Sequence, residues 1–136
     1  MMQQTAYGLV VETPKSYEET LGIVREALKE QGFGVITEID VKQTVKEKLG
    51  IDFGRYIILG ACNPQLAHQA LQADIEIGLL LPCNVVVREK DGGSVVSALD
   101  PRTMAEVSRN PKIAEIASVA REKLEQALAR IKSAAS

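Results

Sequence analysis

A β-hairpin in the second half of the chain constrains the fold more than any other feature. Residues 83–89 are rich in valine and predict a strand. Asp91-Gly92-Gly93 follows as a tight turn, and residues 95–99 predict a second strand. Strands joined by so short a turn pair antiparallel, so at least part of the sheet is antiparallel. The hairpin therefore favours an α+β fold over a doubly wound parallel one.

Turn and cap residues place the other elements of the first half. Three more strands are predicted, over residues 7–12, 33–39 and 56–62. Ser16 and Glu19 form a capping box for a helix that ends at Gly32. Asp40 caps a second, short helix that ends at Gly50.

Proline after a capping residue marks three later helix starts, at Asn63-Pro64, Asp100-Pro101 and Asn110-Pro111. The last helix is the clearest, because its apolar residues step by three or four from Ile113 to Ile131. This helix and the one that starts at Ser16 are expected to cover one face of the sheet. The other face must be solvated, hold a ligand or pack on a second subunit.

One segment, residues 74–82, has conflicting signals. Its apolar residues alternate as in a strand, whereas Gly78 and Pro82 disfavour a regular central strand. The chain of 136 residues suits a single domain over 1–136, with 133–136 expected to form a frayed tail.

Composition excludes several classes of function. A net charge of -2, few aromatic residues and no tryptophan argue against a nucleic-acid binder. No apolar run is long enough to cross a membrane, and no signal peptide is apparent. Two cysteines without export predict a reduced, cytoplasmic protein. No phosphate loop, Rossmann fingerprint or hydrolase motif is present, so no cofactor is expected and no enzyme activity is indicated.

The candidate functional site consists of Cys62-Asn63 and Cys83-Asn84, each at a predicted strand end. Cys62 directly precedes a helix N-terminus, a position that favours a thiolate. Asn63 and Asn84 have amide groups that can donate hydrogen bonds to a bound oxyanion or carbonyl. Both cysteines would equally suit a protein core, where free cysteine is a small apolar residue.

Three other residues are weaker candidates. His68 is the one histidine and, with Cys62 and Cys83, would complete a set of three zinc or copper ligands. The spacing matches no compact metal motif, and His68 is predicted on the solvated side of its helix, so no metal is expected. Asp40 and Asp100 could act as acid or base groups, but both also serve as helix caps.

Two segments resemble a known family. Residues 60–68 (GACNPQLAH) and 77–85 (IGLLLPCNV) are similar to the family called domain of unknown function 302, as are residues 39–42, 46–50 and 99–101. The resemblance implies a two-layer α+β domain with a curved, mainly antiparallel sheet backed by helices, similar to TATA-binding-protein-like folds. It also implies an intracellular bacterial or archaeal homodimer, and it supplies no reaction.

Two functions follow as hypotheses. The first is a homodimeric module that binds a small ligand or another protein, with the site on the open sheet face or in the subunit cleft. The second is a thiol-dependent or metal-assisted protein that uses Cys62 and Cys83, with His68 as a possible helper.

Overall fold

The computed structural model describes residues 2–134, and within them it has one six-stranded sheet and five α-helices. The strands are β1 (Gln3–Gln4), β2 (Gly8–Thr13), β3 (Gly34–Asp40), β4 (Tyr56–Cys62), β5 (Cys83–Lys90) and β6 (Gly93–Leu99). The helices are α1 (Tyr17–Glu30), α2 (Val41–Leu49), α3 (Pro64–Ala73), α4 (Arg102–Ser108) and α5 (Pro111–Ala134), with one 3₁₀ helix, η1 (Ile75–Leu80).

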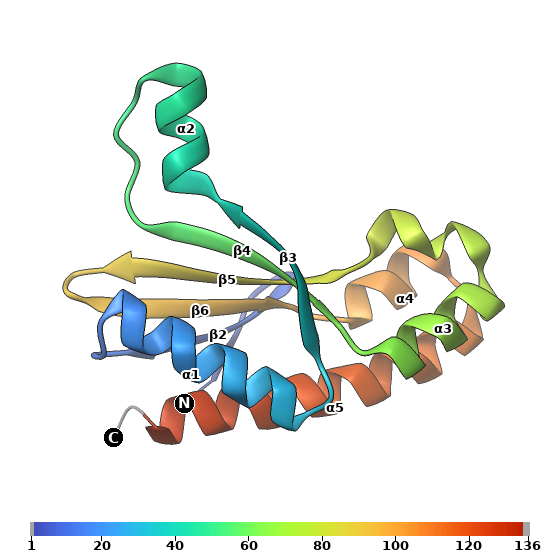
Figure 1. Ribbon diagram of the computed structural model, residues 1–136. Coiled ribbons are helices and arrows are strands. Elements are labelled where there is room, and N and C mark those ends of the chain that lie inside the picture. Colours follow the sequence, from blue (N-terminus) through green and yellow to red (C-terminus); the bar gives the residue numbers. More distant parts are fainter. Residues whose placement is uncertain (1, 135–136) are drawn as a thin grey trace.

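The sheet is antiparallel throughout, in the order β1-β2-β6-β5-β4-β3. It is curved and open, and α1 and α5 pack side by side on one face, below the sheet in Figure 1. This confirms the predicted two-layer α+β fold. The hairpin that predicted it is formed by β5 and β6, which pair from Lys90 and Gly93 outward.

The predicted caps of α1 and α2 form with the expected geometry, whereas Asp100 is not the cap of α4: the N-cap is Pro101, and Asp100 accepts the Arg102 N–H from one residue further back. The Ser16 hydroxyl accepts a hydrogen bond from the Glu19 backbone N–H, and the Asp40 carboxylate accepts one from Gln43. Gly50 ends α2 in the left-handed region, with φ of 68°. Local chemistry thus sets most element boundaries.

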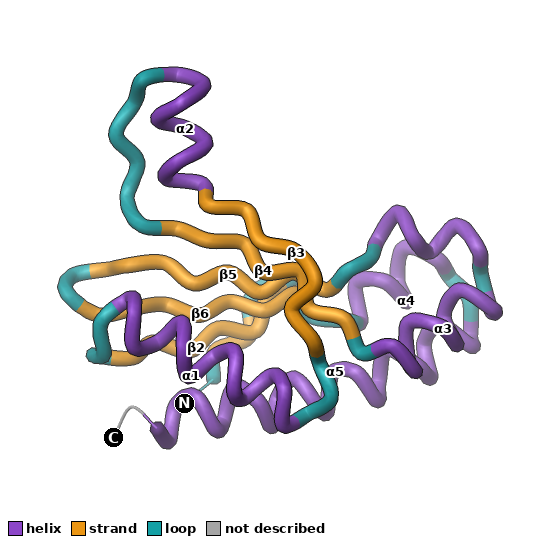
Figure 2. Tube along the Cα trace, viewed as in Figure 1, coloured by secondary structure: helices purple, strands orange, loops and turns teal. Residues whose placement is uncertain are grey.

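The apolar side chains form two separate clusters. The larger lies between the sheet and α1 with the second half of α5, and includes Leu9, Leu59, Val85 and Leu128. The smaller lies beyond the strand ends, where α3, η1 and α4 meet the first half of α5. Figure 2 shows these helices as a group at one end of the sheet, which we call the end cap.

Residues 74–82 differ from the alternating pattern of their sequence. They form η1, which Asp74 caps by accepting a hydrogen bond from Glu76, and the chain then turns at Pro82. Ile77 alone in η1 is buried, whereas Ile75 and Leu79 are exposed. The alternating apolar residues therefore belong to a short helix from which only Ile77 points inward.

Both chain ends add structure that the sequence did not indicate. Gln3 and Gln4 form the short strand β1 beside β2. Helix α5 continues through Ser133 and Ala134, which belong to the predicted frayed tail, and the rest of that tail lies outside the described residues.

One helix does not pack on the body of the protein. Figure 1 shows α2 projecting away from the sheet, at the end opposite the end cap. None of its residues is buried. We call residues 41–53, from the start of α2 to Phe53, the arm.

Candidate functional site

The strand register brings the two cysteines together. β4 ends at Cys62 and β5 begins at Cys83, and the two strands are neighbours. Cys83 lies directly opposite Ala61, so Cys62 is one residue out of register with it. Both cysteines are free thiols, Cys83 buried and Cys62 half-buried. They line the same cavity, which we call the cysteine cavity.

The cysteine cavity has a volume of about 300 Å³ and lies between the sheet end and the end cap. Its walls come from β3, β4, the start of β5, the helices α3, α4 and α5, and η1. Its lining is apolar except for Asn63 and the two thiols, and its larger apolar members are Phe33, Ile36, Leu66, Leu71, Leu81, Met104 and Ile116.

Small side chains explain why there is a void. Ala61, Ala67, Ala70 and Ala120 face it from three different elements, and Gly78 closes one side. The backbone of each element is held in place by larger residues elsewhere, so these methyl groups cannot close the gap. An apolar space of this kind receives a ligand without desolvating many polar groups.

The two asparagines are on different sides of the sheet. Asn63 lines the cavity, but its Oδ1 accepts the Leu66 N–H at 3.2 Å as the N-cap of α3. Asn84 is exposed, because the residue after Cys83 in a strand points to the opposite face. There it lines a second hollow of about 520 Å³ with Tyr56 and Arg88. The structure therefore unites Cys62, Asn63 and Cys83, and separates Asn84 from them.

The cavity environment keeps one thiol neutral. Burial, together with the neighbouring Cys62, raises the pKa of the Cys83 thiol to about 11. No arginine, lysine or histidine is among the described residues that line the cavity. Cys83 is therefore an apolar, protonated wall residue at neutral pH.

The other sequence candidates lie elsewhere. His68 is exposed on α3 and does not line the cavity, and Asp40 is the exposed cap of α2. Across residues 2–134, no three His, Cys, Asp or Glu side chains gather as a metal site. Zinc would need a third ligand of that kind beside the two cysteines.

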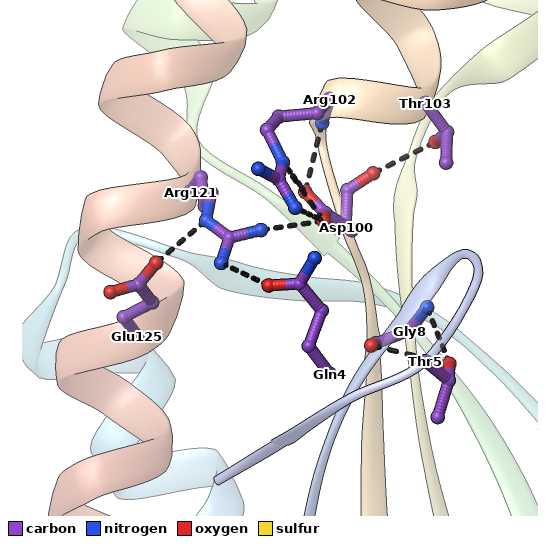
Figure 3. Close-up of polar contacts among 8 residues, drawn as sticks. All are labelled: Gln4, Thr5, Gly8, Asp100, Arg102, Thr103, Arg121 and Glu125. Atoms are coloured by element: carbon purple, nitrogen blue, oxygen red, sulfur yellow. Dashed lines mark hydrogen bonds and ion pairs between the residues drawn. The ribbon is translucent and has the colours of Figure 1, made fainter.

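Asp100 belongs to a polar cluster on the edge of the end cap (Figure 3). Its Oδ2 accepts hydrogen bonds from Arg121 at 2.5 Å and from Arg102 at 2.9 Å. Arg121 also donates to Glu125 at 2.6 Å and to Gln4 at 3.0 Å. The cluster joins the end of β6 to α5 and to β1, so its contacts are those of a structural support.

Opposing effects set the acidity of Asp100. Its burial raises its pKa, but hydrogen bonds from Arg102 and Arg121 and the positive charge of Arg121 outweigh this and hold the pKa below its usual value. The carboxylate is only 3% exposed. A buried charge with two guanidinium partners stabilises the fold as long as it stays ionised.

The sequence analysis did not identify several residues that line the cysteine cavity or belong to the Asp100 cluster. Met104, Ile116 and Ala120 reach the cavity from α4 and α5, and no motif marks them. Arg121 could have been identified from the sequence. It follows Ala117 by one helical turn, so its charged side chain lies beside the buried stripe of α5. Such a charge needs a partner, and that partner is Asp100.

Comparisons with known proteins agree with this architecture. The family model described as "Domain of unknown function DUF302" matches residues 9–131. The chain belongs to this family. A crystal structure titled as an uncharacterised conserved DUF302 protein from Bacillus stearothermophilus is similar, with 30% identity and a TM-score of 0.87. The match covers 94% of this chain and all of that one. The search of curated proteins gave no match.

The family and its solved structure confirm the resemblance expected from residues 60–68 and 77–85. The family description names no function. No helix within residues 2–134 has both the length and the apolar composition needed to cross a bilayer.

The environment of Cys83 predicts unequal thiol reactivity. In the native state near neutral pH, we expect iodoacetamide to modify Cys62 first. Cys83 should react about a hundredfold or more slowly than an ordinary cysteine, because a pKa of about 11 leaves little thiolate. Peptide mapping by mass spectrometry against time checks this. Equal labelling of both cysteines before unfolding would contradict it.

The Asp100 cluster predicts a pH-dependent loss of stability. Asp100→Asn should lower the free energy of unfolding by about 2 kcal/mol at neutral pH, since it removes a charge that two arginines share. A depressed folded pKa stabilises the protein above the unfolded value of about 3.9, and this stabilisation is lost as the pH falls further. The difference in free energy of unfolding between wild type and variant should therefore become smaller below about pH 4, which urea unfolding at several pH values can measure.

Asp91→Asn is the matched control, because Asp91 is exposed in the hairpin turn and asparagine tolerates its positive φ. It should leave both stability and its pH dependence unchanged. If the free energies of unfolding of wild type and Asp100→Asn differed by the same amount at every pH, Asp100 would act through the shape of its side chain rather than its charge.

Proposed function

We propose that the protein is a homodimeric module that binds a small apolar molecule in the cysteine cavity. The single observation that supports this most is the lining: among its described residues, only Asn63, Cys62 and Cys83 bear a polar or thiol group. The Asn63 side-chain oxygen serves as a helix cap, whereas its amide N–H₂ donates no hydrogen bond within residues 2–134. The site thus combines apolar walls with one donor for orientation.

The open sheet face supports ligand binding less well. Its hollow is larger, at about 520 Å³, but Arg88, Tyr7 and Tyr56 line it beside apolar residues. Such a mixed lining retains water more readily than the almost wholly apolar lining of the cysteine cavity. We therefore place the ligand at the junction between sheet and end cap, rather than on the open sheet face or in the subunit cleft that the sequence suggested.

Two further parts of the proposal concern state and location. Exposed apolar side chains within residues 36–53 support a homodimer, because a monomeric protein rarely exposes many large apolar residues in one region of its surface. Free thiols on neighbouring strand ends support a cytoplasmic location, where cysteines stay reduced.

Indole is a suitable test probe, since it is small and apolar and the chain contains no tryptophan to mask its fluorescence. We expect indole to bind saturably, with a blue-shifted emission and a rise in Tm. Ala67→Phe should weaken binding about tenfold or more, because the phenyl ring occupies the cavity. The Tm of this variant without indole checks that it folds.

Ala114→Phe is the control, since it places the same ring on the exposed side of α5. It should bind indole as wild type does. Absence of any saturable indole signal, or equal binding by Ala67→Phe, would overturn the cavity as a ligand site.

A second candidate function is thiol-dependent or metal-assisted, and one observation favours it. Met104 lines the cavity together with Cys62 and Cys83, so two thiols and a thioether share one apolar space. Soft sulfur ligands of this kind select Cu(I). His68, the third ligand considered from sequence, is outside the cavity.

This candidate predicts stoichiometric Cu(I) binding in competition with bicinchoninate under reducing conditions. Met104→Leu, which keeps volume and apolarity, and Cys62→Ser should each weaken it, whereas His68→Ala should have no effect. Failure of wild type to compete for Cu(I) would remove the metal-assisted function and leave apolar binding intact.

A further inference from the structure

Half of the large exposed apolar side chains lie in one short stretch of chain. Residues 36–53 contain five of the ten large apolar residues that are exposed among the described residues. These are Ile36, Ile39, Leu49, Ile51 and Phe53, with exposed fractions from 42% for Phe53 to 67% for Leu49. The stretch consists of most of β3 and the whole arm. We call it the edge-and-arm surface.

Helix α2 is too short to be stable without a covering partner. It has nine residues and no buried side chain. Isolated helices of fewer than about 12 residues are marginal in water, and packing supplies most helix stability in proteins. Its caps at Asp40 and Gly50 and the exposed Lys46–Asp52 pair add only small increments.

The apolar residues of α2 lie where a partner would be expected. Val41, Val45 and Leu49 step by four, so they form one stripe along the helix. Ile51 and Phe53 continue the apolar surface in the loop that returns to β4. The chain itself half-buries Val41 and Val45, whereas Leu49 is exposed, so the C-terminal end of the stripe is the part left open.

Strand β3 adds an unpaired sheet edge to the same surface. It is the last strand in the sheet order, and it pairs with β4 on one side. After an irregularity between Val35 and Thr37, the run from Thr37 to Asp40 is regular and has neither lysine nor proline to block a further strand. Free N–H and C=O groups along this edge can accept another antiparallel strand.

Charge identifies the partner. The edge-and-arm surface has three lysines and four acidic residues, so its net charge is -1: Lys42, Lys46 and Lys48 against Glu38, Asp40, Glu47 and Asp52. Nucleic acid or an anionic membrane would select for an excess of cations. A surface that carries both signs in nearly equal number, with an apolar stripe and an open edge, can pair with a second copy of itself across a twofold axis.

We propose that two copies of this chain form a twofold dimer through the edge-and-arm surface. The α2 stripe of each copy covers apolar surface of the other, and the two β3 edges lie against each other near the axis. This inference rests on the homodimer of the proposed function and identifies its interface. It also explains why α2 is helical at all: the partner supplies the packing that its own chain does not.

Leu49→Lys is the decisive variant. Leu49 is 67% exposed and lysine has a similar helix propensity, so the fold of a single copy should not suffer. We expect wild type to have twice the chain mass of 14.7 kDa by light scattering. Leu49→Lys should raise the dimer dissociation constant at least tenfold. Its α2 amides should also exchange with deuterium faster than in wild type.

Leu79→Lys is the matched control, since Leu79 is 83% exposed on η1 at the far end of the molecule. It should dimerise as wild type does. A dimer unaffected by Leu49→Lys, or weakened equally by both variants, would overturn this interface while the homodimer stands. A wild-type monomer at all concentrations would overturn the homodimer and its interface, whereas indole binding tests the cavity independently.

Discussion

The continuous apolar stripe of α5 is the interaction on which the rest of the structure depends. In its first half, Ile113 and Ile116 pack in the end cap, and in its second half Leu124, Leu128 and Ile131 pack against the sheet. One helix thus belongs to both apolar clusters. Arg121 lies between the halves and ties α5 to Asp100 at the end of β6. Without this helix, the end cap would have no fixed position relative to the strand ends.

The cysteine cavity is a direct result of that arrangement. Where α5 passes from one cluster to the other, its inward residue is Ala120, and small residues of α3 and β4 face it. The cavity therefore lies where the apolar cluster on the sheet meets the apolar cluster of the end cap. The arm lies at the other end of β4 from the cavity, and Ile36 of β3 belongs both to the cavity lining and to the edge-and-arm surface, so the two proposed sites adjoin at this residue.

Local signals in the sequence were sufficient for most of the fold. The Asp91-Gly92 turn, the Ser16 and Asp40 caps and the α5 periodicity each depend on neighbouring residues, and each predicted its element correctly. Residues 74–82 were ambiguous because alternating apolar residues suit a strand and also a short helix with one inward side chain. The likeness to TATA-binding-protein-like folds stays a prediction.

The candidate site was less accessible to such reasoning, because it depends on contacts between distant segments. Neighbouring strand ends placed Cys62 and Cys83 on one cavity, a proximity that the sequence alone left open. Asn84 points to the other face because successive residues of a strand alternate, a rule that already applied to the predicted strand over residues 83–89. Met104 and Ala120 came from helices whose direction depends on the whole core.

The position of β2 in the sheet has a consequence for how the chain is made. Gly8 pairs with Leu99 and Thr13 with Ser94, so the first long strand can pair only with the two-residue β1 until β6, the last strand of the sheet, has been synthesised. Loops that large close slowly, and proteins rich in such distant pairings fold late and at lower rates. During translation, β3, β4 and β5 can associate first, and the nascent protein would complete its sheet only when β6 leaves the ribosome and recruits the N-terminus.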